Sequence, residues 1–340
     1  MPSLSRAFQG LVSLAALPLA SGCALAALAG LGGGLSDWLD IPTHFAPLWA
    51  IGGAAAAALS LFGLPEFPRR AVLVYAALAI TASGLLVVPE YLAKSPKAAI
   101  DAPRQVRLVQ FNAWGKRNAD YDGSLAWLLQ SNADVIVMPE PPRQLIDGMK
   151  KGGYHLSCFD AANTYCAVAI LSREEPLRRG IVAHRDGRSF PPLARATLHA
   201  PGGGSFTVVG AHFVWPTESH QQSWQRDRLG AVISQSGPHE RLIVAGDFNS
   251  TPWSFARRHD DKAWGLERRT RGLFSWPTRR VTVKGHGVPF PFLPIDHVYA
   301  GSDWRTVSVE RGPMLGSDHY PVIATLALAP SGSLRIEHGD

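Results

Sequence analysis

The first ninety residues contain three long runs without a charged side chain, and these runs constrain the fold more than any other feature. They cover residues 7–36, 45–65 and 71–89. A helix needs about 20 apolar residues to cross the ~30 Å hydrocarbon layer of a membrane, and each run is of that length. A helix buried in a soluble protein usually keeps a polar face, which these runs lack. The pattern predicts three transmembrane helices, at about residues 8–34, 45–64 and 71–90.

The cationic residues beside these runs predict the orientation of the chain. Arg6 precedes the first run, and Arg69 and Arg70 lie between the second and the third, whereas the first connection carries two aspartates and no cation. Short loops rich in Lys and Arg stay in the cytoplasm. Three crossings from an internal N-terminus place the chain after residue 91 outside. We therefore predict a multi-pass protein of a bacterial inner membrane with a periplasmic domain.

A cleaved leader is the alternative for the first run. Arg6 precedes an apolar region, and residues 20–23 loosely match the cleavage box of a lipoprotein. Against cleavage, Ala20 stands where Leu is usual, and the apolar run continues past Cys23. The sequence alone leaves cleavage of the N-terminus open.

The remaining chain suits one large domain with a sizeable core. We assign residues 1–92 to the anchor, 93–103 to a linker with two lysines and two prolines, 104–330 to the domain and 331–340 to a tail. The formal net charge of +6 favours an anionic partner.

Short apolar runs alternate with amphipathic segments in this domain. Helices are predicted over residues 124–130 and 222–236, the latter with Trp224, Leu229 and Ile233 at helical spacing. Strands are predicted over residues 106–112, 135–139, 166–172, 195–199, 206–212, 242–247, 297–299 and 322–328. Mixed strands with interleaved helices predict two packed sheets with helices outside.

Polar side chains lie at the ends of these strands. Asp247 and Asn249 directly follow the apolar run at residues 242–245, and a spacing of two residues points both side chains the same way. The other polar residues beside strand ends are Asn112, Glu140, His212, Asp296, Asp318 and His319. Strand ends that meet at one rim would assemble these residues into a single active site.

In this order, the segments resemble the endonuclease/exonuclease/phosphatase superfamily, which contains pancreatic-type deoxyribonuclease, apurinic endonuclease, sphingomyelinase and inositol-phosphate 5-phosphatases. The resemblance covers roughly residues 104–328 and rests on six motifs in family order with family-like spacing. It implies an α/β fold, a four-layer α/β sandwich of two packed mixed β-sheets flanked by helices, here preceded by three transmembrane helices. It also implies a divalent-metal-dependent phosphoesterase, with residues 104–330 as its catalytic domain.

The resemblance implies roles for the strand-end residues. Glu140 would be the principal metal ligand, with Asn112 and Asp318 beside it. The ion would be Mg²⁺, with Mn²⁺ as an alternative, since a hard cation needs few carboxylates and keeps several waters. Asp247 would position or activate the attacking water, and Asn249 would hold the phosphate.

Two imidazoles complete the expected catalytic group. His319 would bond a phosphoryl oxygen as charge builds on it, and Asp296 would hold the other ring nitrogen and so fix the tautomer. His212 is a second imidazole of the kind that the deoxyribonuclease and sphingomyelinase branches use. A histidine packed in the core is the alternative for His212, and a turn-capping asparagine is the alternative for Asn112.

The substrate is less constrained than the chemistry. Residues 257–284 carry nine cations and three aromatic residues, among them Arg257, Arg258 and Trp276. Trp114, two residues after Asn112, could line the substrate groove or simply pack. Cations with aromatics suit a nucleic-acid backbone with stacked bases, or anionic lipid headgroups, or a solvated loop without a partner.

The sequence therefore predicts a membrane-embedded phosphodiesterase whose substrate is nucleic acid or a phospholipid headgroup. A nuclease-like hydrolase is the first expectation, and a phospholipid or sphingomyelin headgroup phosphodiesterase is the alternative. An inactive membrane-tethered binding module is the alternative of another class, and no protein partner is predicted.

Cys158 and Cys166 stand eight residues apart in the domain, across a segment predicted to be a hairpin turn. An oxidising compartment would permit a disulfide between them. Two buried thiols that face different ways are the alternative, and the sequence leaves both open.

Overall fold

The structure, a computed structural model, describes residues 2–61, 66–158, 166–181 and 193–329. The predicted tail at 331–340 and the predicted turn between Cys158 and Cys166 lie outside these residues. The chain forms two compact units. Met1–Ala93, Pro216–Ser219 and Ser250–His259 form a helical unit, and Lys94–Trp215, His220–Asn249 and Asp260–Asp340 form a second unit.

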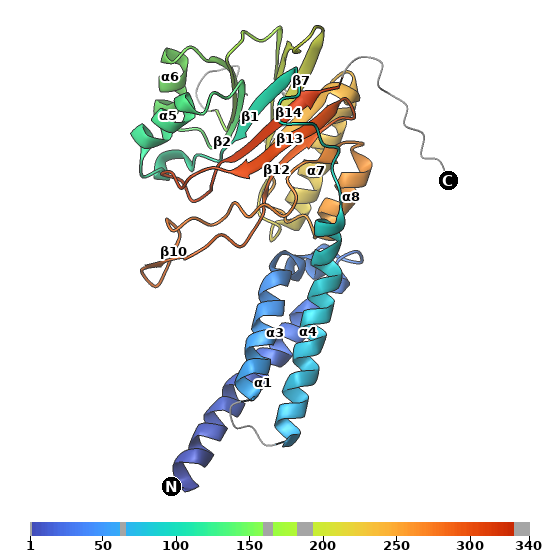
Figure 1. Ribbon diagram of the computed structural model, residues 1–340, viewed down its shortest axis with the longest axis vertical. Coiled ribbons are helices and arrows are strands. Elements are labelled where there is room, and N and C mark those ends of the chain that lie inside the picture. Colours follow the sequence, from blue (N-terminus) through green and yellow to red (C-terminus); the bar gives the residue numbers. More distant parts are fainter. Residues whose placement is uncertain (1, 62–65, 159–165, 182–192, 330–340) are drawn as a thin grey trace, which may run out of the picture. The chain divides into compact units, whose positions relative to one another are not determined.

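Three long helices make up most of the helical unit, in which small residues let the helices approach closely. The helices are α1 (Pro2–Leu31), α2 (Asp37–Asp40), the 3₁₀ helix η1 (Ile41–Phe45), α3 (Ala46–Ser60) and α4 (Glu66–Leu92), with α1, α3 and α4 side by side (Figure 1). Ala20 and Ala24 of α1 are buried, and a Cβ atom on Gly53 of α3 would lie 3.1 Å from that of Ala79 on α4. Contacts between small residues are typical of helices that pack without large side chains between them.

The outer faces of these helices are apolar and exposed. Leu14 is 75% exposed, Ile51 60% and Leu85 61%. Within the described residues, two helical stretches are long and apolar enough to cross a membrane, Leu14–Leu31 and Glu66–Leu92.

The prediction of three such helices is wrong for the middle one. Helix α3 has 15 residues, which at the α-helical rise is about 22 Å, short of a ~30 Å hydrocarbon layer. The prediction rested on the uncharged run at residues 45–65, of which residues 62–65 lie outside the described residues, and absence of charge does not indicate where a helix ends.

The second unit contains two six-stranded mixed sheets. The first has the order β13 (Trp304–Arg311), β14 (Val322–Leu328), β1 (Gln105–Gln110), β2 (Val135–Pro139), β4 (Val168–Ser172) and β3 (His155–Cys158). The second has the order β5 (Arg178–Ile181), β6 (Leu193–His199), β7 (Ser205–His212), β8 (Leu242–Asp247), β12 (Asp296–Ala300) and β9 (Glu267–Arg268). A separate hairpin pairs β10 (Thr282–Val283) with β11 (His286–Gly287).

Helices cover the outer faces of both sheets. They are α5 (Tyr121–Gln130), α6 (Arg143–Lys151) and α7 (Ser219–Ser234), with short 3₁₀ helices η2 (Gly115–Arg117) and η3 (His239–Arg241). Helix α8 (Phe255–Ala263) begins in the helical unit. Alternation along the strands builds the layers: Val106 and Leu108 of β1 pack between the two sheets, whereas Val109 packs with α5 and α6. Two mixed sheets flanked by helices are thus confirmed.

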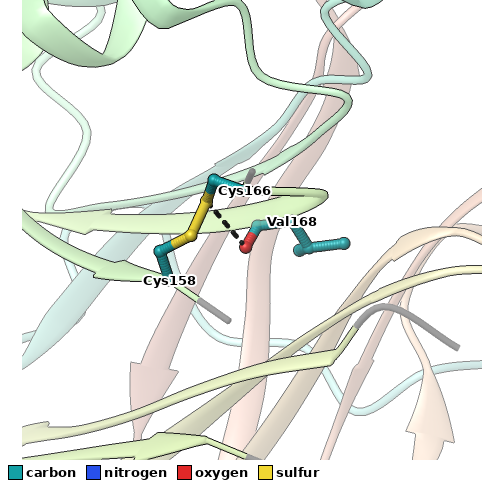
Figure 2. The surroundings of a disulfide bond; sticks show 3 residues. All are labelled: Cys158, Cys166 and Val168. Carbon is teal, nitrogen blue, oxygen red and sulfur yellow. Dashed lines mark hydrogen bonds between the residues drawn. A yellow bond between two sulfur atoms is a disulfide. The ribbon is translucent and has the colours of Figure 1, made fainter. Parts of the chain in front are cut away.

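A disulfide joins Cys158 at the end of β3 to Cys166, two residues before β4 (Figure 2). The two Cα atoms lie 5.8 Å apart, and Sγ of Cys166 lies 3.4 Å from the carbonyl oxygen of Val168. The structure thus decides between the two alternatives that the sequence left open.

Strand register brings polar residues to one end of each sheet. In the second sheet, His212 of β7 pairs with Asp247 of the parallel strand β8, and Asp247 pairs with Asp296 of the antiparallel strand β12. In the first sheet, Asn112 and Glu140 follow the parallel strands β1 and β2, and the antiparallel strand β14 begins just after His319.

Candidate active site

A buried hydrogen-bonded chain links the two sheets. Asp296 Oδ2 lies 2.8 Å from Nδ1 of His319, and Asp296 Oδ1 accepts a 2.8 Å hydrogen bond from Nε2 of Gln110. All three side chains are buried. The backbone N–H of His319 donates to the hydroxyl of Ser317, which itself donates to the carbonyl oxygen of Asn112. The imidazole is therefore fixed through its Nδ1, and Nε2 is the nitrogen left for chemistry.

Asp247 lies at the centre of the group. Its Oδ1 accepts from the backbone N–H of Asn249 at 2.9 Å, and its Oδ2 accepts from Nδ2 of Asn112 at 2.9 Å. The same Oδ2 lies 3.5 Å from Nε2 of His319 and 3.7 Å from Nε2 of His212. One buried carboxylate oxygen thus faces both imidazoles.

Strand β8 runs very close to the backbone of strand β7 at Gly246. A Cβ atom on Gly246 would lie 1.9 Å from the carbonyl oxygen of Ala211, which cannot move without shifting strand β7. Only glycine allows β7 and β8 to approach this closely, and the approach sets the position of Asp247, the next residue.

Asn112 and Glu140 form the part of the site contributed by the first sheet. Nδ2 of Asn112 lies 3.2 Å from Oε1 of Glu140, and that oxygen is 3.7 Å from Nε2 of His212. The Glu140 backbone donates to the carbonyl oxygen of Ala167 at 3.0 Å. The carboxylate is about one third exposed, so it can meet a ligand from solvent.

Three residues of this rim have left-handed backbones, namely Trp114 (φ 61°), Glu140 (φ 46°) and Asn249 (φ 48°). Such a conformation costs a non-glycine residue on the order of 1 kcal/mol or more, and it persists only where the surroundings enforce it. Three cases beside one another at strand ends indicate a site whose geometry is maintained at a cost in stability.

Asn249 is held by its amide nitrogen, because Nδ2 donates to the carbonyl oxygen of Phe213 at 2.7 Å. Among the residues that the structure describes, its buried Oδ1 has no hydrogen-bond partner. A buried acceptor without a donor is suited to a ligand that supplies a donor or a positive charge.

Asp318 lies beside an aromatic group. Nε1 of Trp276 donates to Oδ2 of Asp318 at 3.2 Å, and the ring of Trp276 packs against Trp215 and Phe292 with centroids 5.4 Å and 5.7 Å away. Trp215 is 42% exposed, so the cluster has an open face. Trp114 is half-buried, and its backbone N–H donates to Oδ1 of Asn112.

Arg257 and Arg258 lie outside the unit that contains this group. Both belong to the helical unit, where Arg257 is fully buried and Arg258 donates to the carbonyl oxygen of Leu86. A pattern of cations and aromatics in the sequence cannot show that its arginines are occupied by helices far away in the chain.

Electrostatics separates the protonation states of the two central groups. Burial raises the pKa of Asp247 to about 6, and the nearby His319 only partly opposes this shift. Burial alone would lower the pKa of His319, but Asp296 and then Asp247 overcome that effect and raise it to about 10. Near neutral pH, His319 is therefore a cation that can donate from Nε2, beside a carboxylate poised to accept a proton.

Residues 109–319 match the sequence model of the Endonuclease/Exonuclease/phosphatase family. The chain belongs to this family. Solved structures similar to this chain include endonuclease/exonuclease/phosphatase family proteins from Bacteroides thetaiotaomicron (13% identity, TM-score 0.55, 67% of this chain and 99% of that one) and Bacteroides vulgatus (17%, 0.55, 66% and 99%). The D. rerio protein TDP2, complexed with single-strand DNA product, has 16% identity and a TM-score of 0.52 over 65% of this chain and 98% of its own.

These structural likenesses concern the fold. Among curated proteins, none matches this chain.

A divalent cation is expected of this family, and the residues of the site fit one. Glu140 offers a carboxylate that is about one third exposed, and Oδ1 of Asn249 is a buried acceptor without a donor among the described residues. Ligand atoms of Asp247, Asp296 and His319 also lie within 4.8 Å of one another. That trio suits a cation less well, because His319 already uses one nitrogen on Asp296 and is protonated at the other.

Gln110 and Ser317 are the residues that the sequence did not single out. Gln110 stands two positions before Asn112, so it shares a strand face with the predicted ligand. A glutamine inside a run of valines and leucines was the available signal, since a buried amide needs a partner.

Proposed function

We propose that the chain is a divalent-metal-dependent phosphodiesterase of the nuclease-like type. The observation that carries this proposal is the position of Asp247 Oδ2, 2.9 Å from Asn112 Nδ2 and 3.5 Å from Nε2 of a protonated His319. Phosphoryl transfer to water needs a base beside the attacking water and a cationic donor beside the phosphoryl oxygens, and Asp247 and His319 provide this pair.

Asp247 acts on the nucleophile in this mechanism. A water molecule beside Oδ2 gives its proton to the carboxylate as its oxygen attacks phosphorus, and the bond between phosphorus and the leaving oxygen breaks in line. A carboxylate with a pKa of about 6 is a stronger base than an ordinary aspartate and is still ionised at neutral pH.

His319 acts on the charge that develops. Its Nε2–H bonds a non-bridging phosphoryl oxygen, and Asp296 and Gln110 keep the ring in place. We propose Glu140 as the anchor of Mg²⁺ or Mn²⁺, with Asn112 and Asp318 beside it, and the cation when bound neutralises phosphoryl charge. His212 is proposed to contact the phosphate, and Oδ1 of Asn249, which lacks a donor among the described residues, is proposed to accept from the attacking water or to meet the cation.

Nucleic acid is the proposed substrate. The open aromatic cluster of Trp215, Trp276 and Phe292 offers faces on which bases can stack, and it is tied to the site through Asp318. TDP2, which shares the fold, was solved with a single-strand DNA product.

A phospholipid headgroup is the second candidate, and the helical unit favours it. Two of its helices are of membrane-crossing length, and their outer faces are apolar. We propose that residues 1–92 anchor the chain in a bacterial inner membrane and that residues 104–330 form the catalytic domain.

We propose an extracytoplasmic position for the catalytic domain. The disulfide between Cys158 and Cys166 requires an oxidising compartment.

The test uses the full chain in detergent micelles with three substrates: single-stranded DNA, sphingomyelin and bis(p-nitrophenyl) phosphate. Each is offered with Mg²⁺, Mn²⁺ or EDTA. Asp247→Asn and His319→Gln are compared with Asp101→Asn and His286→Gln, which change the same residue types at exposed positions.

We expect metal-dependent turnover that both site variants lose and both control variants keep. Turnover of DNA alone supports the nuclease, and turnover of sphingomyelin alone supports the lipid alternative. A folded protein that is silent on all three substrates contradicts the proposal and favours a binding module.

A further inference from the structure

The segment that follows the catalytic strand belongs to the helical unit. Residues 250–259 continue the chain directly from Asn249, and they cluster with Met1–Ala93. Thr251 and Ser254 of this segment are completely buried.

Asp40 holds the start of α8 within this unit. Its Oδ1 accepts from the backbone N–H of Phe255 at 2.8 Å, and its Oδ2 accepts from the backbone N–H of Ala256 at 2.9 Å. These N–H groups have no partner inside their own helix, because the first turn of any helix leaves its donors unused. A buried carboxylate from 215 residues away thus adds to the local cap, in which the hydroxyl of Ser254 accepts from the backbone N–H of Arg257 at 3.2 Å.

His44 holds the same segment at Thr251, two residues after Asn249 in the chain. Its Nδ1 accepts from the backbone N–H of Thr251 at 3.1 Å and lies 3.0 Å from the hydroxyl of Thr251. Burial, with a contribution from Arg257, lowers the pKa of His44 to about 3. The ring is therefore neutral at physiological pH, which leaves Nδ1 available as an acceptor.

Two glycines make this arrangement possible. A Cβ atom on Gly33 would lie 2.7 Å from Oδ1 of Asp40 and 2.7 Å from the ring of Phe255. On Gly34 it would lie 3.2 Å from the same ring. The ring of Phe255 thus packs directly against the turn after α1. A methyl group at Gly33 would push the Asp40 carboxylate and the Phe255 ring away from this turn.

We propose that Asp40 and His44 are positioning residues for the phosphoesterase site, acting through residues 250–256. The inference rests on the proposed function. Asn249 has a left-handed backbone, and its N–H is bonded to Asp247, so the next residues must be held for that geometry to persist. The helices of the first unit supply that hold, and their role extends beyond anchoring the chain.

The test compares full-chain variants in detergent micelles with two readouts. Hydrogen exchange of the amides of residues 250–256 reports the hold itself, and turnover of bis(p-nitrophenyl) phosphate reports its consequence. Gly33→Ala is the main variant. Gly84→Ala is the matched control, because nothing lies within 4 Å of a Cβ atom there.

For Gly33→Ala we expect exchange of these amides to accelerate about ten-fold, as for the loss of a helix cap. We expect kcat to fall by at least as much, with KM changed far less. Asp40→Ala should behave like Gly33→Ala, whereas Asp40→Asn should recover only part of the activity, because asparagine has one acceptor oxygen for the two backbone N–H groups that Asp40 caps.

Unchanged exchange in Gly33→Ala and Asp40→Ala overturns the inference, and so does faster exchange with an unchanged kcat. A wild-type chain without turnover refutes the proposed function. In that case the exchange readout still decides whether the helices hold the segment.

Discussion

Replacing Asp296 by asparagine tests how the site controls the charge of His319. The substitution keeps the shape of the side chain and removes its negative charge, 2.8 Å from Nδ1 of the imidazole. The substitution also changes the partner of Gln110, because the Oδ1 atom that accepts its hydrogen bond is no longer part of a charged carboxylate. An amide can also present its NH₂ group to Nδ1, which would require a neutral ring.

The structure sets the size of the effect. Two unit charges 2.8 Å apart interact by at most about 6 kcal/mol at an effective dielectric constant near 20. A hydrogen bond to a charged rather than a neutral partner adds at least ~1 kcal/mol. These limits correspond to a fall of about one to four units in the pKa of His319, which burial and the two aspartates place at about 10.

The assay is the pH dependence of kcat for bis(p-nitrophenyl) phosphate between pH 6 and 10.5. In the wild type, the alkaline limb should lie near the His319 pKa of about 10. In Asp296→Asn it should move to between about pH 6 and 9, with kcat at pH 7 reduced about ten- to hundred-fold.

Asp303→Asn is the control, because Asp303 also holds a cation, Arg241 at 3.1 Å, but contacts no residue of the site. A folded Asp296→Asn protein with the pH profile and kcat of the wild type would refute the reasoning. So would a wild-type alkaline limb below pH 8.

Four further outcomes follow from the geometry. Gln110→Leu should lower kcat about three- to ten-fold in steady-state assays, because Asp296 loses one of its two hydrogen bonds, and an unaltered kcat would contradict this. Gly246→Ala should abolish folding or activity, as judged by thermal unfolding and turnover, because its methyl group would meet the backbone of Ala211. Cys158→Ser should lower the free energy of unfolding by about 2.5 kcal/mol, as for a loop of eight residues, and dithiothreitol should reproduce the loss in the wild type only. The raised pKa of His319 means that its protonated form adds stability, fully present below about pH 6.5 and lost as the pH rises to about 10; His319→Gln should therefore show a weaker fall in denaturant-measured stability over that range.

Most of the sheets, and the gathering of most of the expected polar side chains at their ends, could be predicted from the sequence, because buried strands produce uninterrupted apolar runs and these polar residues follow where the runs end. Strand β8 and Asp247 illustrate this, since all residues of the strand are buried. Strand β13 was missed for the opposite reason: it is an edge strand with mostly half-buried and exposed residues, so its sequence carries no continuous apolar signal.

Contacts that are distant in sequence set the limits of prediction. Arg257 and Arg258 were expected to meet substrate, yet Arg257 is buried within the helical unit. Asp40 and Thr251 bond partners more than 200 residues away, and no local pattern reveals such pairs. Helix α3 was predicted too long, because a run of uncharged residues does not indicate where a helix ends.

Hydrolysis of bis(p-nitrophenyl) phosphate by the full chain, with Mg²⁺ or with EDTA, tests the central claim most directly. The account predicts turnover that EDTA stops and that Asp247→Asn reduces by at least a hundred-fold while Asp101→Asn leaves it unchanged. Equal turnover in Asp247→Asn and the wild type would contradict the assignment of Asp247 as the group that activates water.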